Sequence, residues 1–303
     1  MVFTGGEPIC RRDVCELAAY AKERGLSTTL LTNGTLVDWR TASRISRSFD
    51  SVVVSLDSWV KEEYELLRPG APFEKAVQGI RNLVEAKVSS LFIRPIITRL
   101  NLTSLPQFPS FAATHLGCLR FSPTLYLPNH SGELEALGLL PDPETYWITL
   151  EHFYGELKKL GGISVQECIP LEASGSCGAG GGVLSVATNG DVYPCQCLHY
   201  DEFRAGNVRE QSISEIIARS PVLTAFRKER WPWFGQCSEC ALMTLCSSTC
   251  RVFYKAFKEH EEMFFARLCP FFKKEIEIKL WREVKKRLRK TGQTSGSVFS
   301  QQI

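Results

Sequence analysis

Residues 237–250 read Cys-Ser-Glu-Cys-Ala-Leu-Met-Thr-Leu-Cys-Ser-Ser-Thr-Cys, so four cysteines follow the spacing C-x2-C-x5-C-x3-C. Three more belong to the same array: Cys177, then Cys195, which follows Gly190 with four residues between them, and finally Cys269. Spacing this regular is typical of metal ligands and not of cysteines scattered by chance. The array therefore predicts a metal framework in the C-terminal part of the chain.

The composition is that of an ordinary soluble protein. The chain has 303 residues, of which 44% are hydrophobic and 23% charged, and this length favours two domains. We find no apolar run long enough to span a membrane and no secretion signal at the N-terminus, so we expect a cytoplasmic protein. In a reducing compartment the 12 cysteines are interpreted as metal ligands, not disulfides. A net charge of +3 gives no reason to expect nucleic acid as a partner.

The first 130 residues or so alternate short apolar strands with amphipathic helices, a pattern typical of βα units around a parallel sheet. Their lengths suit a barrel. The candidate strands are Val2–Thr4, Thr28–Thr32, Ser51–Leu56, Leu91–Ile97 and Leu119–Leu125. We therefore expect an α/β fold for this part of the chain.

The character of the sequence changes after Gly161. A loop around residues 129–142 and a helix over about 143–160 precede a region with short strands and many cysteines and glycines. Asn189-Gly190 between two apolar runs predicts a β-hairpin. A last helix over about 271–290 has a basic end, which we interpret as a solvated face, since Ile276, Leu280, Val284 and Leu288 recur every four residues and face the protein. The alternative is a surface for an acidic partner.

Two sequence patterns follow predicted strands, at the end where βα folds place their ligands. Gly5-Gly6-Glu7-Pro8 comes directly after the first strand; its glycines allow close approach to the backbone, and its carboxylate is suited to an ammonium group. Ser55 and Asp57 come at the end of the third strand. Alone, each pattern is equally well explained by a tight turn or by helix capping.

Taken with the cysteine array, these patterns resemble the radical S-adenosylmethionine (radical SAM) superfamily, specifically members with a C-terminal SPASM domain that binds auxiliary iron-sulfur clusters. The resemblance implies that Gly5, Gly6 and Glu7 contact the methionyl amine of SAM, and that Ser55 and Asp57 lie near its ribose and the substrate. No residue is assigned as catalytic.

The same resemblance assigns the thiols to two auxiliary 4Fe-4S clusters. It gives Cys237, Cys240, Cys246 and Cys269 to one cluster, and Cys177, Cys195 and Cys250 to the other. For the missing ligand of the second cluster we favour Cys168; the alternatives are Cys197 or an open iron. A zinc site is the rival for residues 237–250, which the complete seven-cysteine pattern disfavours.

The family's radical-generating 4Fe-4S cluster is held by a C-x3-C-x2-C loop, and this sequence contains no such loop. Because Gly5-Gly6-Glu7 already follows the first strand, we expect a partial (βα)6 barrel that lacks its first βα unit. We favour an N-terminal truncation as the cause; the alternative is that the cell makes this form, either as a partner that completes a split enzyme or as a non-catalytic cluster-binding module. The expected parts are residues 1–164 with barrel strands two to six, residues 165–275 as an α+β SPASM domain, and residues 276–303 as the basic helix end and a disordered tail. Such a chain would be inactive by itself.

The resemblance implies an enzyme that modifies a peptide or protein by hydrogen abstraction with a 5′-deoxyadenosyl radical, assisted by the auxiliary clusters. SAM and a third 4Fe-4S cluster belong to the full-length form, and flavodoxin or ferredoxin is the expected electron donor. The alternatives are a haem-pathway enzyme that tailors tetrapyrroles and a non-catalytic electron-transfer or scaffold module.

Overall fold

The computed structural model describes residues 1–127, 137–164, 178–228, 234–246 and 250–290. The chain forms two compact units, Met1–Leu127 with Gly138–Ile169 and Pro128–Leu137 with Pro170–Ile303. The last of these boundaries in chain order, between Ile169 and Pro170, falls within residues 165–177. These residues, which include Cys168 and Cys177, lie outside the described part of the chain. The domain boundary expected at residue 165 therefore stays a prediction.

The first unit is built on a parallel sheet of six strands in the order β1-β2-β3-β4-β6-β8. This sheet confirms the predicted α/β fold. Its strands are β1 (Val2–Phe3), β2 (Thr29–Thr32), β3 (Ser51–Ser55), β4 (Leu91–Arg94), β6 (Arg120–Phe121) and β8 (Ile163–Ser164). The last of them was not among the predicted strands, because a strand of two residues is too short to show an alternating apolar pattern.

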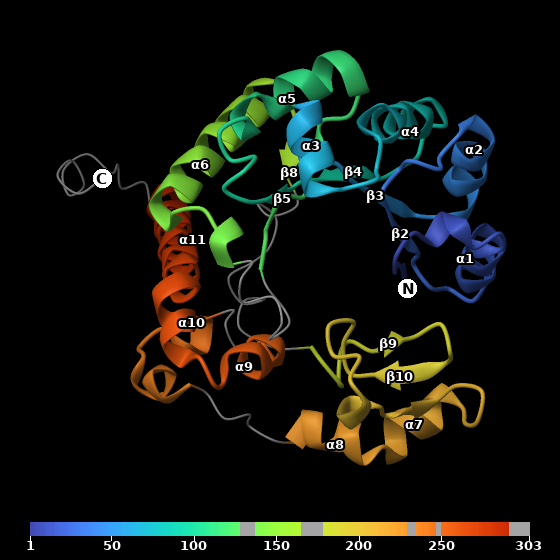
Figure 1. Cartoon of the computed structure of the whole chain (residues 1–303), viewed down its shortest axis with the longest axis vertical. Helices are drawn as coiled ribbons and strands as arrows, with labels where there is room; N and C mark the ends of the chain where they lie inside the picture. Colours follow the sequence, from blue (N-terminus) through green and yellow to red (C-terminus); the bar gives the residue numbers. More distant parts are fainter. Residues whose placement is uncertain (128–136, 165–177, 229–233, 247–249, 291–303) are drawn as a thin grey trace. The chain divides into compact units, whose positions relative to one another are not determined.

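Helices lie in a row along one face of this sheet (Figure 1). They are α1 (Val14–Glu23), α2 (Trp39–Ser48), α4 (Phe73–Glu85), α5 (Phe108–Phe111) and α6 (Pro143–Lys159), with α3 (Lys61–Leu67) and the short turns Pro8–Cys10, Leu105–Gln107 and Ala112–Leu116 between them. Val52 and Val54 of β3 and Ile80 and Leu83 of α4 are fully buried. Their burial stabilises the unit through the hydrophobic effect.

Prolines divide two of the predicted strands. The expected strand Leu91–Ile97 is split at Pro95 into β4 and β5 (Ile96–Ile97), and Leu119–Leu125 is split before Pro123 into β6 and β7 (Thr124–Leu125). Proline has no N–H group to donate to a ladder, so continuous pairing ends there. β5 and β7 pair with each other in a separate parallel ladder.

The second unit contains a small antiparallel sheet, short helices and one long helix. Its elements are β9 (Ser185–Val186), β10 (Asp191–Tyr193), β11 (Gly206–Asn207), α7 (Ile213–Arg219), α8 (Pro221–Lys228), α9 (Arg251–Phe257), α10 (Glu261–Arg267), α11 (Cys269–Lys290) and the 3-10 turns Asp201–Phe203, Gly235–Glu239 and Met243–Leu245. The predicted hairpin at Asn189-Gly190 is confirmed, since β9 and β10 pair antiparallel and Gly190 has a φ of 92°.

Aromatic side chains form the core beside the cysteine segment. Phe257 and Phe264 are fully buried, and the ring of Phe234 lies 4.5 Å from that of Phe264. Along α11, Ile276 is buried as expected, whereas Val284 is 40% exposed. The predicted inward-facing stripe was therefore wrong at Val284, because helical spacing alone does not show how far along a helix the core extends.

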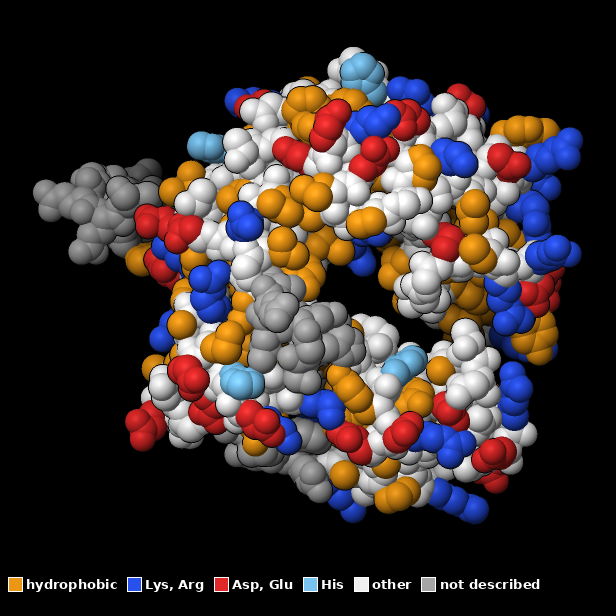
Figure 2. Space-filling view, viewed as in Figure 1, with side chains coloured by type: hydrophobic (Ala, Val, Ile, Leu, Met, Phe, Trp, Pro, Cys, Tyr) orange, Lys and Arg blue, Asp and Glu red, His pale blue; other side chains and the backbone are white. Residues whose placement is uncertain are grey.

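Positive and negative side chains are interspersed on the face of each unit that Figure 2 shows. In the part of the chain that the structure describes, no helix combines the length and the apolar character needed to cross a membrane.

Candidate functional site

The loop after β1 places the Gly5-Gly6-Glu7 motif at the carboxyl end of the parallel sheet. Gly5 has a φ of 137°, a conformation that L side chains rarely adopt, and both glycines are exposed with nothing near the position of an added Cβ. The backbone here is open to a ligand. Glu7 caps the following turn by accepting a hydrogen bond from Ile9 N at 3.1 Å.

The carboxylate of Glu7 also ties this loop to the end of β2. Its Oε1 accepts from the Thr32 hydroxyl at 2.8 Å, and its Oε2 accepts from Asn33 N at 2.8 Å. A carboxylate has about four acceptor sites, so three of them are used within the protein. The remaining capacity suits one further donor, such as an ammonium group.

The turn that receives Glu7 is itself held by α4. Gly34 has a φ of 77°, and an added Cβ there would lie 2.9 Å from Val54 Cγ1. An added Cβ on Gly79 of α4 would lie only 2.1 Å from Gly34 O. Two glycines therefore let helix and turn approach closely, and this approach fixes the position of the Glu7 partners.

Ser55 and Asp57, the other two residues expected near the cofactor, have different surroundings. Ser55 ends β3, is half-buried and lies in register beside Arg94 of β4. Asp57 is 4% exposed, and its carboxylate accepts from Arg68 Nε at 2.5 Å and from Ile96 N at 2.9 Å. Because the carboxylate of Asp57 is engaged in the protein, Ser55 is the better candidate for a ligand contact.

Arg94 is a candidate that the sequence interpretation missed. Its Nε is buried and has no hydrogen-bond partner among the residues that the structure describes, and its Nη2 donates to the Ser122 hydroxyl at 3.5 Å. Burial lowers the pKa of the guanidinium. A guanidinium with an unpartnered donor is suited to a carboxylate or phosphate. The available signal was a lone charge that ends the apolar strand Leu91-Phe92-Ile93.

Four of the predicted thiols lie close enough together to influence each other's ionisation. Burial raises the pKa of Cys237 to about 11, and repulsion from Cys246, Cys269 and Cys240 adds to the shift. Burial also raises the pKa of Cys269, against the attraction of Lys273. These are the four thiols that the resemblance assigns to one cluster. Iron prefers thiolate ligands, so their chemistry and grouping fit an iron-sulfur cluster.

The segment that carries these thiols is shaped by successive turns. Cys237 N donates to Phe234 O at 2.8 Å, and Cys240 N donates to Cys237 O at 3.1 Å. Among the described residues, no three His, Cys, Asp or Glu side chains are gathered closely enough to hold a single metal ion.

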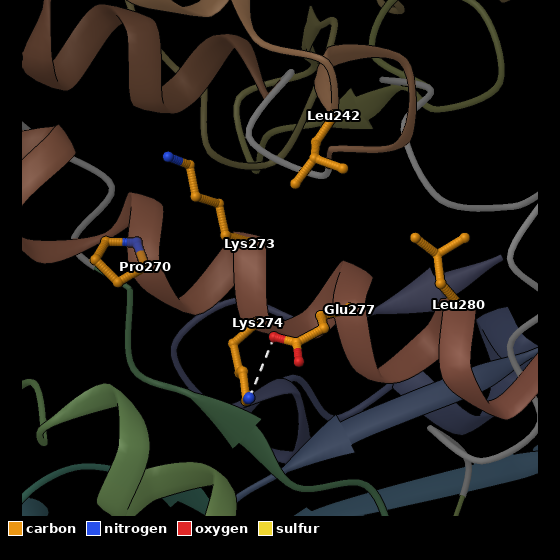
Figure 3. A pocket seen from close by; sticks show the side chains of 6 residues that line it. All are labelled: Leu242, Pro270, Lys273, Lys274, Glu277 and Leu280. Carbon is orange, nitrogen blue, oxygen red and sulfur yellow. Dashed lines mark hydrogen bonds and ion pairs between the residues drawn. The ribbon is translucent and has the colours of Figure 1, made fainter. Parts of the chain in front are cut away.

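A pocket of about 400 Å³ is lined mainly by side chains of α11 (Figure 3). Its lining combines apolar groups with two lysines, and Lys274 is paired with Glu277 at 3.1 Å. The lining residues are Leu242, Pro270, Lys273, Lys274, Glu277 and Leu280.

Two of the three thiols assigned to the other cluster, Cys195 and Cys250, are described, and both are partly buried. A hydrogen bond with Cys197 and then burial raise the pKa of Cys195. Cys177 and the favoured fourth ligand, Cys168, lie outside the described residues.

The remaining cysteines belong to the first unit. Cys15 and Cys118 are buried and Cys10 is exposed. Burial raises the pKa of both buried thiols, as expected for small apolar residues in a core.

Two family models match the chain: the radical SAM superfamily over residues 1–108, and SPASM, an iron-sulfur cluster-binding domain, over residues 177–241. Mycofactocin maturase MftC of Mycobacterium ulcerans (strain Agy99) is 30% identical over 260 residues, which cover 81% of this chain and 68% of the maturase. MftC of Mycobacterium tuberculosis (strain H37Rv) is also 30% identical, over 81% of this chain. The chain spans 64% of the length of that maturase. AdoMet-dependent heme synthase of Methanosarcina barkeri is 29% identical over 83% of this chain and 76% of the synthase.

Solved structures share the fold. The structure of anSMEcpe with bound AdoMet and Cp18Cys peptide has a TM-score of 0.66 at 21% identity, over 91% of this chain and 85% of that chain. SuiB of Streptococcus suis bound to the precursor peptide SuiA has a TM-score of 0.64 at 19% identity, over 82% of this chain and 60% of that chain. With the two family models and the maturase match, these folds lead to one conclusion: the chain belongs to the radical SAM superfamily and carries a SPASM iron-sulfur cluster-binding domain.

Proposed function

We propose that this chain acts as a radical SAM/SPASM enzyme, or as part of one, that modifies a peptide or protein substrate. Its relatives include mycofactocin maturases, and SuiB and anSMEcpe, which share its fold, were solved with peptides bound. The observation that carries the proposal is the set of polar groups at the carboxyl ends of the parallel strands, with Glu7 after β1, Ser55 on β3 and Arg94 on β4. Parallel α/β sheets bind their ligands at this edge.

We assign each of these groups a role toward SAM. Glu7 has one acceptor direction left for the methionyl ammonium, and Gly5 and Gly6 keep the backbone open beside it. Arg94 pairs through its unpartnered Nε with the methionyl carboxylate. The Ser55 hydroxyl binds the ribose. Bound SAM would supply, with one electron from the 4Fe-4S cluster of the full-length form, the chemistry that removes a hydrogen atom from the substrate.

In the second unit we assign two auxiliary 4Fe-4S clusters to the cysteine array. One of them is held by Cys237, Cys240, Cys246 and Cys269. The other has Cys195 and Cys250 among its ligands. A flavodoxin or ferredoxin is the proposed electron donor.

SAM binding tests the first part of this proposal. In anaerobic titrations we expect Arg94→Met to weaken SAM binding by about 10- to 100-fold, the loss of one charge-assisted contact. Arg47→Met is the matched control, because Arg47 is an exposed arginine on α2 that donates to a neighbour on the same helix, Ser43 Oγ, at 3.0 Å. Equal affinities for both variants and the unaltered chain would remove Arg94 from the site.

Turnover tests the second part. With a C-x3-C-x2-C segment joined upstream, the reduced protein is incubated with SAM and a peptide encoded beside its gene. The expected result is 5′-deoxyadenosine together with a mass change in the peptide. SAM cleavage that leaves every candidate peptide unaltered would count against peptide modification.

A tetrapyrrole is the second candidate substrate, because the heme synthase of Methanosarcina barkeri is 29% identical over 83% of this chain. Fe-coproporphyrin III is the probe. A shift of its Soret band on mixing, followed by conversion of the porphyrin during SAM cleavage, would favour this alternative. An unchanged spectrum would exclude it.

A further inference from the structure

We propose that α11 and the pocket on it bind an acidic segment of the peptide substrate, one that carries a large apolar side chain. The inference rests on the proposed function and deepens it, because it names the chemical class of the peptide and a second place where the chain holds it. The carboxyl edge of the parallel sheet acts on the residue to be modified, whereas α11 binds another part of the same peptide.

The first observation is the charge of α11. The helix has nine basic and three acidic residues, an excess larger than the net charge of +3 of the whole chain. Each of its three glutamates already pairs with a basic residue of the same helix, in the ion pairs Lys274–Glu277, Lys279–Glu275 and Arg287–Glu283. The helix therefore has no further carboxylate of its own to balance the excess, and it attracts acidic ligands.

The second observation is the apolar surface on the same helix. Phe271, Phe272 and Ile276 in its first half are buried, so the core covers this part. Further along, Trp281 is 43% exposed and Val284 is 40% exposed. Tryptophan is enriched at the centres of protein interfaces, where it supplies much of the binding energy. The second half of α11 therefore offers apolar contact area together with positive charge.

The pocket joins these two properties at one place. Leu242, the N-cap of the turn Met243–Leu245, and Leu280 of α11 project into the same space (Figure 3). Its volume of about 400 Å³ lies in the range of ligand sites. Lys273 also lines the pocket and is exposed, and no carboxylate among the described residues pairs with it. An apolar space beside such an ammonium group fits an apolar side chain that has a carboxylate next to it.

Charge also decides between the possible occupants. Residues 291–303, which follow α11 in the sequence, contain no Asp or Glu and so do not complement the helix. The α11 helix of a second copy would bring the same positive charge. A nucleic-acid backbone matches the charge, but it has no aliphatic side chain for a space lined by Leu242, Pro270 and Leu280. An acidic peptide with apolar side chains satisfies both requirements.

Peptide binding to the anaerobically reconstituted full chain tests the inference. The probe is a fluorescein-labelled peptide of repeated Glu-Leu-Leu-Glu units, followed by fluorescence anisotropy. Two further peptides have glutamine in place of each glutamate, or serine in place of each leucine. We expect each replacement to weaken binding by about 10-fold, because the first removes the charge pairing and the second removes the buried apolar side chain. Added salt should weaken binding of the acidic peptide and leave that of the glutamine peptide nearly unchanged.

Two variants of the chain locate the binding. Lys274→Gln removes a positive charge and leaves Glu277 unpaired at the pocket, and Leu280→Ser removes an apolar wall; each should weaken binding of the acidic peptide several-fold. The matched control for the first is Lys159→Gln, because Lys159 is an exposed lysine on α6 that pairs with Glu156 at the same helical spacing. The control for the second is Leu66→Ser, an exposed leucine on α3. If Leu280→Ser does not fold, Lys274→Gln still decides, since it changes only an exposed side chain.

Hydrogen exchange of the unaltered chain with the acidic peptide should show protection over residues 270–284. Equal affinity for all three peptides, equal affinity of Lys274→Gln and Lys159→Gln, or protection confined to other segments would overturn the proposal. An oligothymidine that displaces the peptide and binds more tightly would assign the surface to nucleic acid and overturn it too. Failure of the proposed function has a different signature: the peptide then binds at α11, but no peptide is modified after the C-x3-C-x2-C segment is joined upstream.

Discussion

Gly79→Ala provides a sharp test of the geometry that supports Glu7. Gly79 lies in the middle of α4, and an added Cβ would stand 2.1 Å from Gly34 O and 2.9 Å from Gly34 C. Ordinary contact begins at 3.4 Å, so helix and turn must separate by about 1.3 Å. Both sides of the contact are backbone, and no side chain can rotate out of the way. The turn at Thr32–Gly34 must therefore move.

The energetic cost follows from two opposing effects. Overpacking of a buried contact costs about 1–3 kcal/mol, and an alanine in mid-helix gains about 0.5–1 kcal/mol over glycine. With two backbone segments in contact, we expect the upper end of the cost and a net loss of about 2 kcal/mol. For a unit of this size, that loss lowers Tm by about 4–8 °C.

Thermal unfolding followed by circular dichroism measures the loss, and hydrogen exchange locates it. Exchange should rise in peptides that cover the end of β2 and the following turn. Gly155→Ala is the matched control: Gly155 is also in mid-helix, but an added Cβ meets nothing within 4 Å, so we expect a gain of about 0.5–1 kcal/mol. If Gly79→Ala melts at or above the temperature of the unaltered chain, the proposed contact between α4 and the turn is wrong.

Three further variants test other parts of the molecule. Asp57→Asn removes the negative charge that pairs with Arg68. Because Arg68 is 25% exposed and its charge stays partly solvated, we expect the free energy of unfolding in urea to fall by only about 1–3 kcal/mol. An unchanged free energy of unfolding would show that the pair contributes nothing. Asp191→Asn should flatten the acid limb of the profile of Tm against pH. Hydrogen bonds from Arg204 and Asn207 lower the pKa of Asp191 in the folded chain. The carboxylate therefore adds to the free energy of unfolding above its unfolded pKa of about 3.9, and this stability is lost as pH falls through the folded pKa. Lys273→Gln should lower the reduction potential of the cluster at Cys269 by about 10–40 mV in an EPR titration, since a nearby cation stabilises the reduced cluster; an unchanged potential would contradict this.

The sequence predicted those features that depend on short-range pattern. The βα alternation gave the parallel α/β fold, and Asn189-Gly190 gave the hairpin. Arg94 was missed because its role depends on register: β3 must pair with β4 before Ser55 and Arg94 become neighbours. The same limit applies to Asp57, whose partner Ile96 N lies 39 positions further along the chain.

The two candidate sites are held in place by different means. Glu7 and Arg94 stand at the ends of strands whose positions are fixed by backbone ladders and by buried valines, so the edge that we propose binds SAM is largely formed before any ligand binds. The thiols stand on short turns, and the thiolate forms of Cys237 and its neighbours repel one another. A bound cluster would remove that repulsion and join the turns, so cluster binding would contribute directly to the stability of the second unit. Under the proposed function, loss of a cluster ligand therefore changes folding as well as redox chemistry, whereas loss of Arg94 chiefly changes ligand binding.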